Sequence, residues 1–85
     1  MTVRDEIETA LRAAFTPSRL EVADVSEDHR GHAGFREGEQ THFDVAITAS
    51  KFVGMARVAK HRAVHAALGA ELIGRIHALS LDIAP

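Results

Sequence analysis

The sequence contains no cysteine, tryptophan or tyrosine, and only two of its 85 residues are proline. Without cysteine the chain has no disulfide framework, no thiolate zinc site, no CxxC redox pair and no thiolate set that holds an iron–sulfur cluster unaided. No apolar run approaches the roughly 20 residues that cross a bilayer. The N-terminus also lacks the basic and apolar regions of a signal peptide. We therefore expect a cytoplasmic protein that does not enter membranes.

The chain also lacks a strong excess of charge of either sign, since its formal net charge is −2. Bulk electrostatics therefore favours neither nucleic acid nor anionic lipid as a partner. Its composition is that of a globular protein, with 46% hydrophobic residues, and it includes six histidines. A chain of this length suffices for one hydrophobic core but not for two, so residues 1–85 are expected to form a single domain.

The hydrophobic pattern predicts two helices and three strands. A helix is predicted to begin at the cap Thr2, with the negative charge of Asp5 in its first turn, and to end before Pro17, because proline disfavours a helical conformation at the residue before it. The remaining elements are predicted from alternating or helical spacing of apolar residues. They are strands over 20–26 and 42–48 joined by a long polar loop over 27–41, a helix over 55–73 and a last strand over 76–84.

This order indicates an α+β fold, in which the helices of an α-β-β-α-β chain cover one face of a three-stranded mixed sheet. The hairpin makes the first two strands antiparallel, and the helical crossover makes the third strand parallel to the second. The loop and the starts of the second and third strands then lie at one edge of the sheet. The sequence therefore predicts that four histidines share one end of the molecule: His29, His32, His42 and His77.

Imidazoles brought together in this way ligate zinc, copper or iron. His29 and His32 stand among polar loop residues and are either solvated or metal ligands. His77 is either a partly buried residue at a strand end or a ligand. His42 is expected on the outer face of its strand, as a structural or capping residue.

A second pair, His61 and His65, has the i, i+4 spacing of zinc-protease helices but lacks the glutamate between the two histidines that acts as the base. Lys60 and Arg62 also surround His61 with positive charge, which disfavours a bound cation. We expect this pair to fill or border the apolar stripe of the helix, which consists of Val58, His61, His65, Leu68 and Leu72.

A small basic cluster lies at and before the start of the second helix, and it either contacts phosphate groups or is a solvated surface. Its members are Lys51, Arg57, Lys60 and Arg62. Residues 31–34 match the G-x-x-G pattern of KH nucleic-acid domains, but they lie between two strands rather than two helices, so we regard the match as coincidental. The sequence has no nucleophile–base signature and no phosphate-binding glycine loop, and enzyme activity is not expected.

Several short motifs, spread from Ile7 to Leu81, together resemble the BolA family. The Phe-x-Gly, basic-His-Arg and His-Ala-Leu blocks, in this order and spacing, are the most specific. The motifs are Leu20-Glu21-Val22 with Asp24-x-Ser26, Thr41-His42-Phe43, Phe52-x-Gly54, Lys60-His61-Arg62 and Ile76-His77-Ala78-Leu79-Ser80-Leu81. The resemblance implies a fold like the class II KH domain.

The resemblance also implies a function, because BolA proteins bind a monothiol glutaredoxin and share a bridging [2Fe–2S] cluster with it. The glutaredoxin supplies its cysteine and bound glutathione, and the BolA partner supplies two ligands. Carried over to this chain, His77 is the C-terminal ligand and His29 the loop ligand, with His32 as its rival. The chain alone would then be a monomer without a cofactor, and with its partner a heterodimer that serves iron–sulfur trafficking or iron sensing.

Two other functions are compatible with the resemblance. BolA proteins also act as DNA-binding transcriptional regulators linked to stress and cell shape. The block Lys60-His61-Arg62 and the Phe52-x-Gly54 turn would carry that role, although Lys60 stands where the family usually has arginine. The other alternative is an interaction module that docks glutaredoxin without metal. The iron–sulfur partner is the favoured hypothesis.

Overall fold

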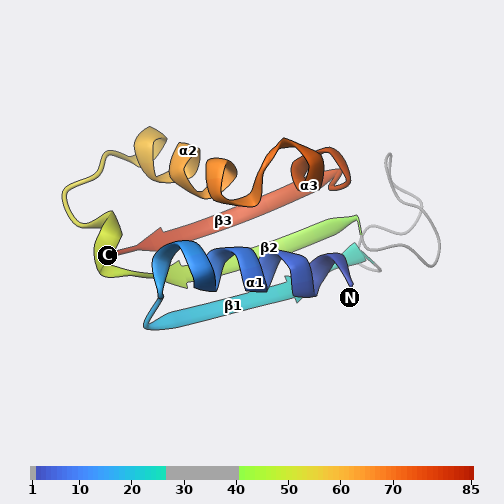
Figure 1. Cartoon of the computed structure of the whole chain (residues 1–85), viewed down its shortest axis with the longest axis horizontal. Coiled ribbons are helices and arrows are strands. Elements are labelled where there is room, and N and C mark those ends of the chain that lie inside the picture. The colour runs from blue at the N-terminus through green and yellow to red at the C-terminus, as the bar shows by residue number, and fades with distance from the viewer. Residues whose placement is uncertain (1, 27–40) are drawn as a thin grey trace.

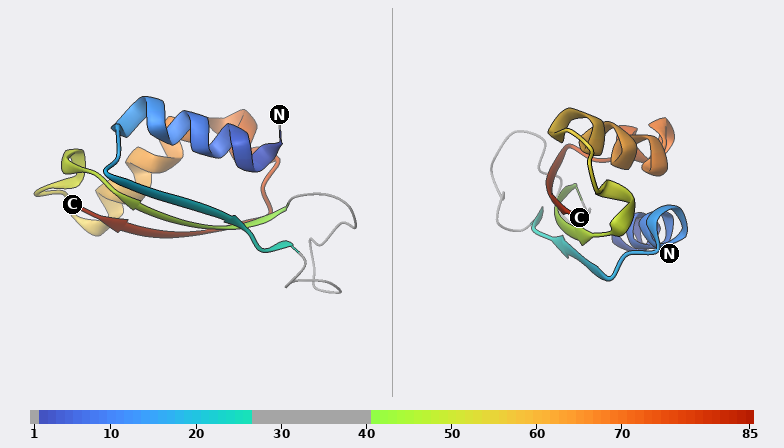
Figure 2. Two further views of the ribbon diagram at one scale, coloured as in Figure 1. Left: turned by 90° about the horizontal axis from the view of Figure 1, so that it is seen from below. Right: turned by 90° about the vertical axis from the view of Figure 1, so that its left-hand side faces the viewer.

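The computed structural model describes residues 2–26 and 41–85, which form a three-stranded sheet with α1 and α2 on the same face (Figures 1 and 2). The predicted α+β class and element order are confirmed. In chain order the elements are α1 (Val3–Phe15), β1 (Arg19–Asp24), β2 (His42–Thr48), the short 3-10 helix η2 (Ser50–Phe52), α2 (Arg57–Leu68), α3 (Ala70–Gly74) and β3 (Ala78–Ala84).

The first helix begins with the predicted cap, in the form of a reciprocal capping box. The Thr2 hydroxyl accepts a hydrogen bond from the Asp5 amide (3.1 Å), and the Asp5 carboxylate accepts one from the Thr2 amide (3.3 Å). These hydrogen bonds satisfy donors that the first turn of a helix leaves without partners. Because they stabilise the charged carboxylate, they also hold the pKa of Asp5 below its ordinary value.

The sheet has β2 in its centre, and its two neighbours run in opposite directions. β1 is antiparallel to β2, with Val22 opposite Val45, whereas β3 is parallel to β2, with Val45 opposite Leu81. The end of β1 and the starts of β2 and β3 consequently lie at one end of the sheet, the right-hand end in Figure 1. This is the arrangement predicted from the crossover.

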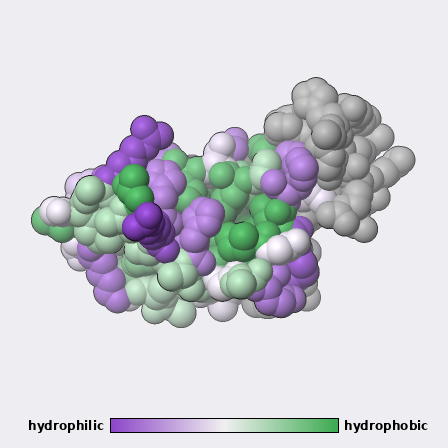
Figure 3. All heavy atoms as spheres, turned by 90° about the horizontal axis from the view of Figure 1, so that it is seen from above, coloured by the Kyte–Doolittle hydropathy of each residue, from purple (hydrophilic) through white to green (hydrophobic). Residues whose placement is uncertain are grey.

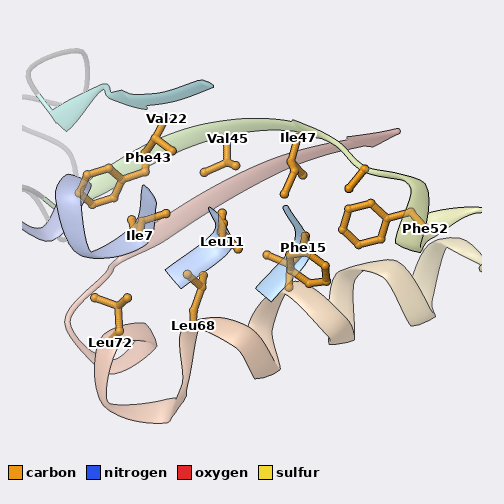
Figure 4. Packing of buried hydrophobic residues seen from close by; sticks show 12 residues of the cluster. Ile7, Leu11, Phe15, Val22, Phe43, Val45, Ile47, Phe52, Leu68 and Leu72 are labelled. Atoms are coloured by element: carbon orange, nitrogen blue, oxygen red, sulfur yellow. The ribbon is translucent and has the colours of Figure 1, made fainter. Parts of the chain in front are cut away.

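The hydrophobic core fills the space between the sheet and the helices (Figure 4). Apolar residues at 3–4 spacing along α1 point toward alternate residues of β2, as the two periodicities require. The rings of Phe15 and Phe52 lie with their centroids 4.8 Å apart and close this core at the end of α1. The most deeply buried large side chains are Phe43, Phe52, Ile7, Leu11, Ile47 and Val64.

The second helix differs from its prediction in two respects. First, the segment predicted as one helix over 55–73 is divided at Gly69, whose φ of 86° and ψ of 153° interrupt the helical backbone between α2 and α3. Second, the buried side chains of α2 are Val64 and Leu68, whereas Val58 is 60% exposed and His65 is exposed. The prediction of an apolar stripe was therefore wrong for its N-terminal members, Val58 and His65 among them. The helix α2 packs against the core chiefly through its C-terminal half.

Gly69 allows a direct test of this interruption. Its φ and ψ lie in a region that is essentially restricted to glycine, and a Cβ at this position would meet no atom within 4 Å. We predict that Gly69→Ala lowers the free energy of unfolding by about 1–3 kcal/mol through backbone strain alone. Gly74→Ala is the matched control, since Gly74 also has open space around its Cβ position but no positive φ. Urea unfolding of both variants checks this, and equal stabilities would refute it.

Candidate metal-ligand site at one end of the sheet

The parallel pairing of β2 and β3 brings two of the predicted histidines together. Ala78, the first residue of β3, is paired with His42, the first residue of β2, and His77 directly precedes Ala78. The ring centroids of His42 and His77 lie 5.1 Å apart. His77 is exposed to solvent, whereas His42 is buried, with 3% relative exposure. The prediction that these two residues share one end of the molecule is therefore confirmed.

His42 is more deeply buried than an outer-face residue was expected to be. Its side chain shares a hydrogen bond of 2.8 Å between Nδ1 and the hydroxyl of Thr41, which is itself buried. Because one ring nitrogen is engaged in this way, the orientation of the His42 imidazole is fixed within the protein. The expectation of a structural role did not anticipate that His42 would also pack against His77.

A hydrogen-bond network connects the end of β1 with the residues at the start of β2 and the start of β3. The carboxylate of Asp24 accepts hydrogen bonds from the Ser26 amide (2.9 Å) and the Ser26 hydroxyl (2.5 Å). The Ser26 hydroxyl oxygen in turn accepts hydrogen bonds from the amides of Thr41 (2.9 Å) and His42 (3.2 Å). The carbonyl of Thr41 then accepts hydrogen bonds from the amides of His77 (2.9 Å) and Ala78 (3.2 Å).

The roles of Ser26 and Thr41 were not predicted from the sequence. The Asp-x-Ser pattern was a usable signal, since an Asp side chain often accepts a hydrogen bond from the amide two residues later. The contact between Ser26 and Thr41, however, spans 15 residues and depends on the pairing of β1 with β2.

Arg75 anchors the chain just before His77 to the first helix. Its guanidinium donates two hydrogen bonds to the Glu6 carboxylate (2.9 and 2.6 Å) and one to Glu71 (3.0 Å). This pairing holds the pKa of Glu6 below its ordinary value, because the hydrogen bonds and the positive charge of Arg75 favour the ionised carboxylate. The chain segment that leads to His77 is thus held to α1 by the Arg75 side chain, and His77 itself is held to Thr41 by a backbone hydrogen bond.

The other two histidines predicted for this end, His29 and His32, lie outside the described residues, as does the G-x-x-G match at 31–34. Within residues 2–26 and 41–85, no group of three or more histidine or acidic side chains is placed to hold a metal ion. His77 is therefore the exposed imidazole that the described structure places at this end, with His42 packed beside it.

The predicted basic residues are divided between two elements. Arg57, Lys60 and Arg62 lie on α2 and form no ion pair with any residue that the structure describes. Lys51 lies in η2, and its ammonium group donates a hydrogen bond to the carbonyl of Ala14 (2.7 Å). Among the described residues, α2 therefore carries three cations that form no ion pair with another described residue.

The surface beside α2 is shallow and mixed in character. A groove of about 320 Å³ lies between α2 and the edge strand β3, lined by basic and apolar side chains and by one acidic residue, Asp82. Figure 3, which faces α2 and β3, shows hydrophilic side chains interspersed with hydrophobic ones. His61 lines this groove, and its Nδ1 donates a hydrogen bond to the carbonyl of Arg57 (2.9 Å). No helix in the described part of the chain is long and apolar enough to span a membrane.

The fold is that of a small α+β domain with a mixed three-stranded sheet and an exposed imidazole at one end of the sheet. A family model described as BolA-like protein matches residues 11–85. The chain is 42% identical over 80 residues to BolA-like protein 1 of Bos taurus, covering 94% of this chain and 56% of the bovine protein. It is 40% identical over 81 residues to the DNA-binding transcriptional regulator BolA of Escherichia coli, covering 95% and 73% of the two chains.

Solved structures show the same relationship. BolA1 from Arabidopsis thaliana superposes with a TM-score of 0.80 and 36% identity, covering 95% of this chain and 88% of that one. The BolA domain of SufE1 from the same plant gives a TM-score of 0.81 and 34% identity, with the same coverage of both chains. The chain belongs to the BolA family. It spans only about half the length of the bovine relative, so that protein includes residues with no counterpart here.

The different burial of the two histidines predicts different effects on stability. We expect His42→Ala to lower the free energy of unfolding by about 2–4 kcal/mol, because it removes a buried ring and leaves the Thr41 hydroxyl without its ring partner. His77→Ala should change it by less than about 0.5 kcal/mol, since the side chain is exposed. Urea denaturation of both variants checks this. Comparable losses would show that His77 also has a structural role.

Proposed function

We propose that this protein is a non-enzymatic partner of a monothiol glutaredoxin and that its histidines complete a bridging [2Fe–2S] cluster. The observation that carries the proposal is the exposed imidazole of His77, held 5.1 Å from the ring of His42 at the end of the sheet where β1 ends and β2 begins. The second ligand is His29, with His32 as its rival. Membership of the BolA family supports the assignment.

The chemistry of the available donors fits this role. Imidazole nitrogen ligates iron in clusters of the Rieske type, in which two histidines replace two cysteines at one iron. A chain without cysteine can therefore contribute to a cluster provided that the partner supplies the thiolates. When bound, the cluster supplies a redox-active iron–sulfur centre whose potential is raised by histidine ligation.

Within this complex the chain itself has two tasks. The backbone hydrogen bonds from His77 and Ala78 to the Thr41 carbonyl fix where the His77 side chain leaves the sheet. The buried His42 ring is oriented by the Thr41 hydroxyl, and the His77 ring packs against it. A BolA domain also occurs within SufE1, which shows that the same fold serves as a module of a larger protein and supports an adaptor role. The physiological outcome would be cluster trafficking or iron sensing.

The test is anaerobic reconstitution with a monothiol glutaredoxin, glutathione, iron and sulfide, followed by visible circular dichroism. We predict a heterodimer whose spectrum differs from that of the glutaredoxin homodimer, and loss of this spectrum with His77→Ala. His65→Ala is the matched control, because His65 is an exposed histidine on α2. His29→Ala and His32→Ala, made separately, identify the second ligand.

An unchanged spectrum with His77→Ala would contradict the ligand assignment. Formation of an equally stable complex by the double variant His29→Ala/His77→Ala, without iron, would instead support a docking module that needs no metal.

A DNA-binding regulator is the second candidate, and it is favoured by the cations of α2 that form no ion pair with another described residue. Phosphate contacts by Lys60 and Arg62 would add local attraction to a chain whose net charge is negative. The E. coli relative is named a DNA-binding transcriptional regulator. The contacts proposed for Lys60 and Arg62 are to the phosphate backbone, and such contacts position a protein on DNA without reading its sequence directly.

Salt dependence distinguishes this candidate from the first. If α2 contacts DNA phosphates, Lys60→Ala and Arg62→Ala should each weaken binding and reduce the slope of log K against log salt concentration by about 1. Arg12→Ala on α1 is the control, because Arg12 is exposed but lies within reach of Glu8. Fluorescence anisotropy with a labelled duplex measures the slopes. Equal slopes for all three variants would exclude α2 as the contact surface.

A further inference from the structure

The backbone ladder between β1 and β2 ends before it reaches the residues that support His77. The last register pair is Asp24 with Phe43, and one further hydrogen bond joins the Val25 amide to the His42 carbonyl (2.9 Å). Thr41 is therefore beyond the ladder on the β1 side. On the β3 side, however, its carbonyl accepts the hydrogen bonds from His77 and Ala78.

Beyond the ladder, the Ser26 hydroxyl accepts the backbone hydrogen bonds that a strand partner would otherwise accept. It lies 4% exposed, donates to the Asp24 carboxylate and accepts from the amides of Thr41 and His42. One donated and two accepted hydrogen bonds use the full capacity of a hydroxyl group. The hydrogen bond from the Ser26 hydroxyl to the Asp24 carboxylate is short, at 2.5 Å, which is typical of the strong hydrogen bonds that carboxylates accept.

We propose that Asp24, Ser26 and Thr41 act as a clamp that positions His77 for iron. The backbone amide of Thr41 donates a hydrogen bond to the Ser26 hydroxyl, and its carbonyl accepts one from the His77 amide. Displacement of Thr41 therefore shifts the point from which the His77 imidazole projects. The Thr41 side chain in addition holds the ring of His42, against which His77 packs. The metal-binding part of this inference rests on the proposed function, whereas the positioning of the two rings does not.

The alternative is that the network stabilises the fold without affecting the histidines. A loss of stability alone would not separate the two possibilities. The readout must therefore be the geometry of the histidine pair in the free protein, together with the behaviour of the cluster in the complex. Positioning matters for a ligand because a site held loosely binds its metal less tightly, even when all of its ligands are present.

The test compares Ser26→Ala with Ser26→Thr, which restores the hydroxyl, and with Ser18→Ala. Ser18 is the matched control, because its exposed hydroxyl donates a single hydrogen bond to the Thr48 carbonyl (3.3 Å), at the start of β1 and the end of β2. In the free protein, we expect Ser26→Ala to weaken the nuclear Overhauser contact between the rings of His42 and His77. We also expect hydrogen exchange at the amides of Thr41 and His77 to become roughly tenfold faster. Ser26→Thr and Ser18→Ala should leave both unchanged.

In the reconstituted complex, we expect Ser26→Ala to shorten the lifetime of the cluster during dilution into chelator, and Ser26→Thr to restore it. If Ser26→Ala does not fold, Asp24→Ala provides the test, since Asp24 is exposed and its removal deprives Ser26 of its acceptor. Its effects should be in the same direction and smaller. An unaltered ring contact and amide exchange in a folded variant would overturn the clamp. Failure of the wild-type protein to form any cluster would refute the proposed function, while the measurements on the free protein would still decide the clamp.

Discussion

The parallel pairing of β3 with β2 determines where the histidines of this protein lie. Because the chain crosses over through α2 and α3, it re-enters the sheet beside the start of β2, and His77 arrives next to His42. An antiparallel β3 would place His77 at the opposite end. The hydrogen bonds from His77 and Ala78 to Thr41, together with the ion pair of Arg75 with Glu6, hold this point of entry. The site therefore follows from the topology rather than from a local motif.

The polar network at this end is buried except for Asp24, and burial makes its arrangement specific. Ser26, Thr41 and His42 are the buried polar residues of the described structure, and no buried side-chain nitrogen or oxygen atom in that part lacks a hydrogen-bond partner. A network of this kind is stable only when each member is satisfied, so it selects one arrangement of the chain ends that meet there. This gives a small domain a rigid support for an exposed imidazole.

Much of the fold was predictable, because alternating apolar residues in β2 and the cap at Thr2 are local signals. The proximity of His42 and His77 was also predictable, since it follows from a helical crossover that makes β3 parallel to its neighbour β2. The break at Gly69 was not, because the helical spacing continues across it and only the backbone conformation shows it. The burial of His42 and the contact of Ser26 with Thr41 depend on side-chain packing between residues distant in the chain, which periodicity does not encode.

The proposed function requires that a histidine nitrogen of this chain binds iron in a cluster shared with a glutaredoxin. Pulsed electron paramagnetic resonance of the reduced complex tests it directly, with histidine labelled with nitrogen-15 in this chain alone. We expect hyperfine couplings from directly bound imidazole nitrogen that change from the nitrogen-14 to the nitrogen-15 pattern on labelling. His77→Ala should remove one set of these couplings. A spectrum that is insensitive to the label would show that the iron is bound by other ligands and would contradict the account.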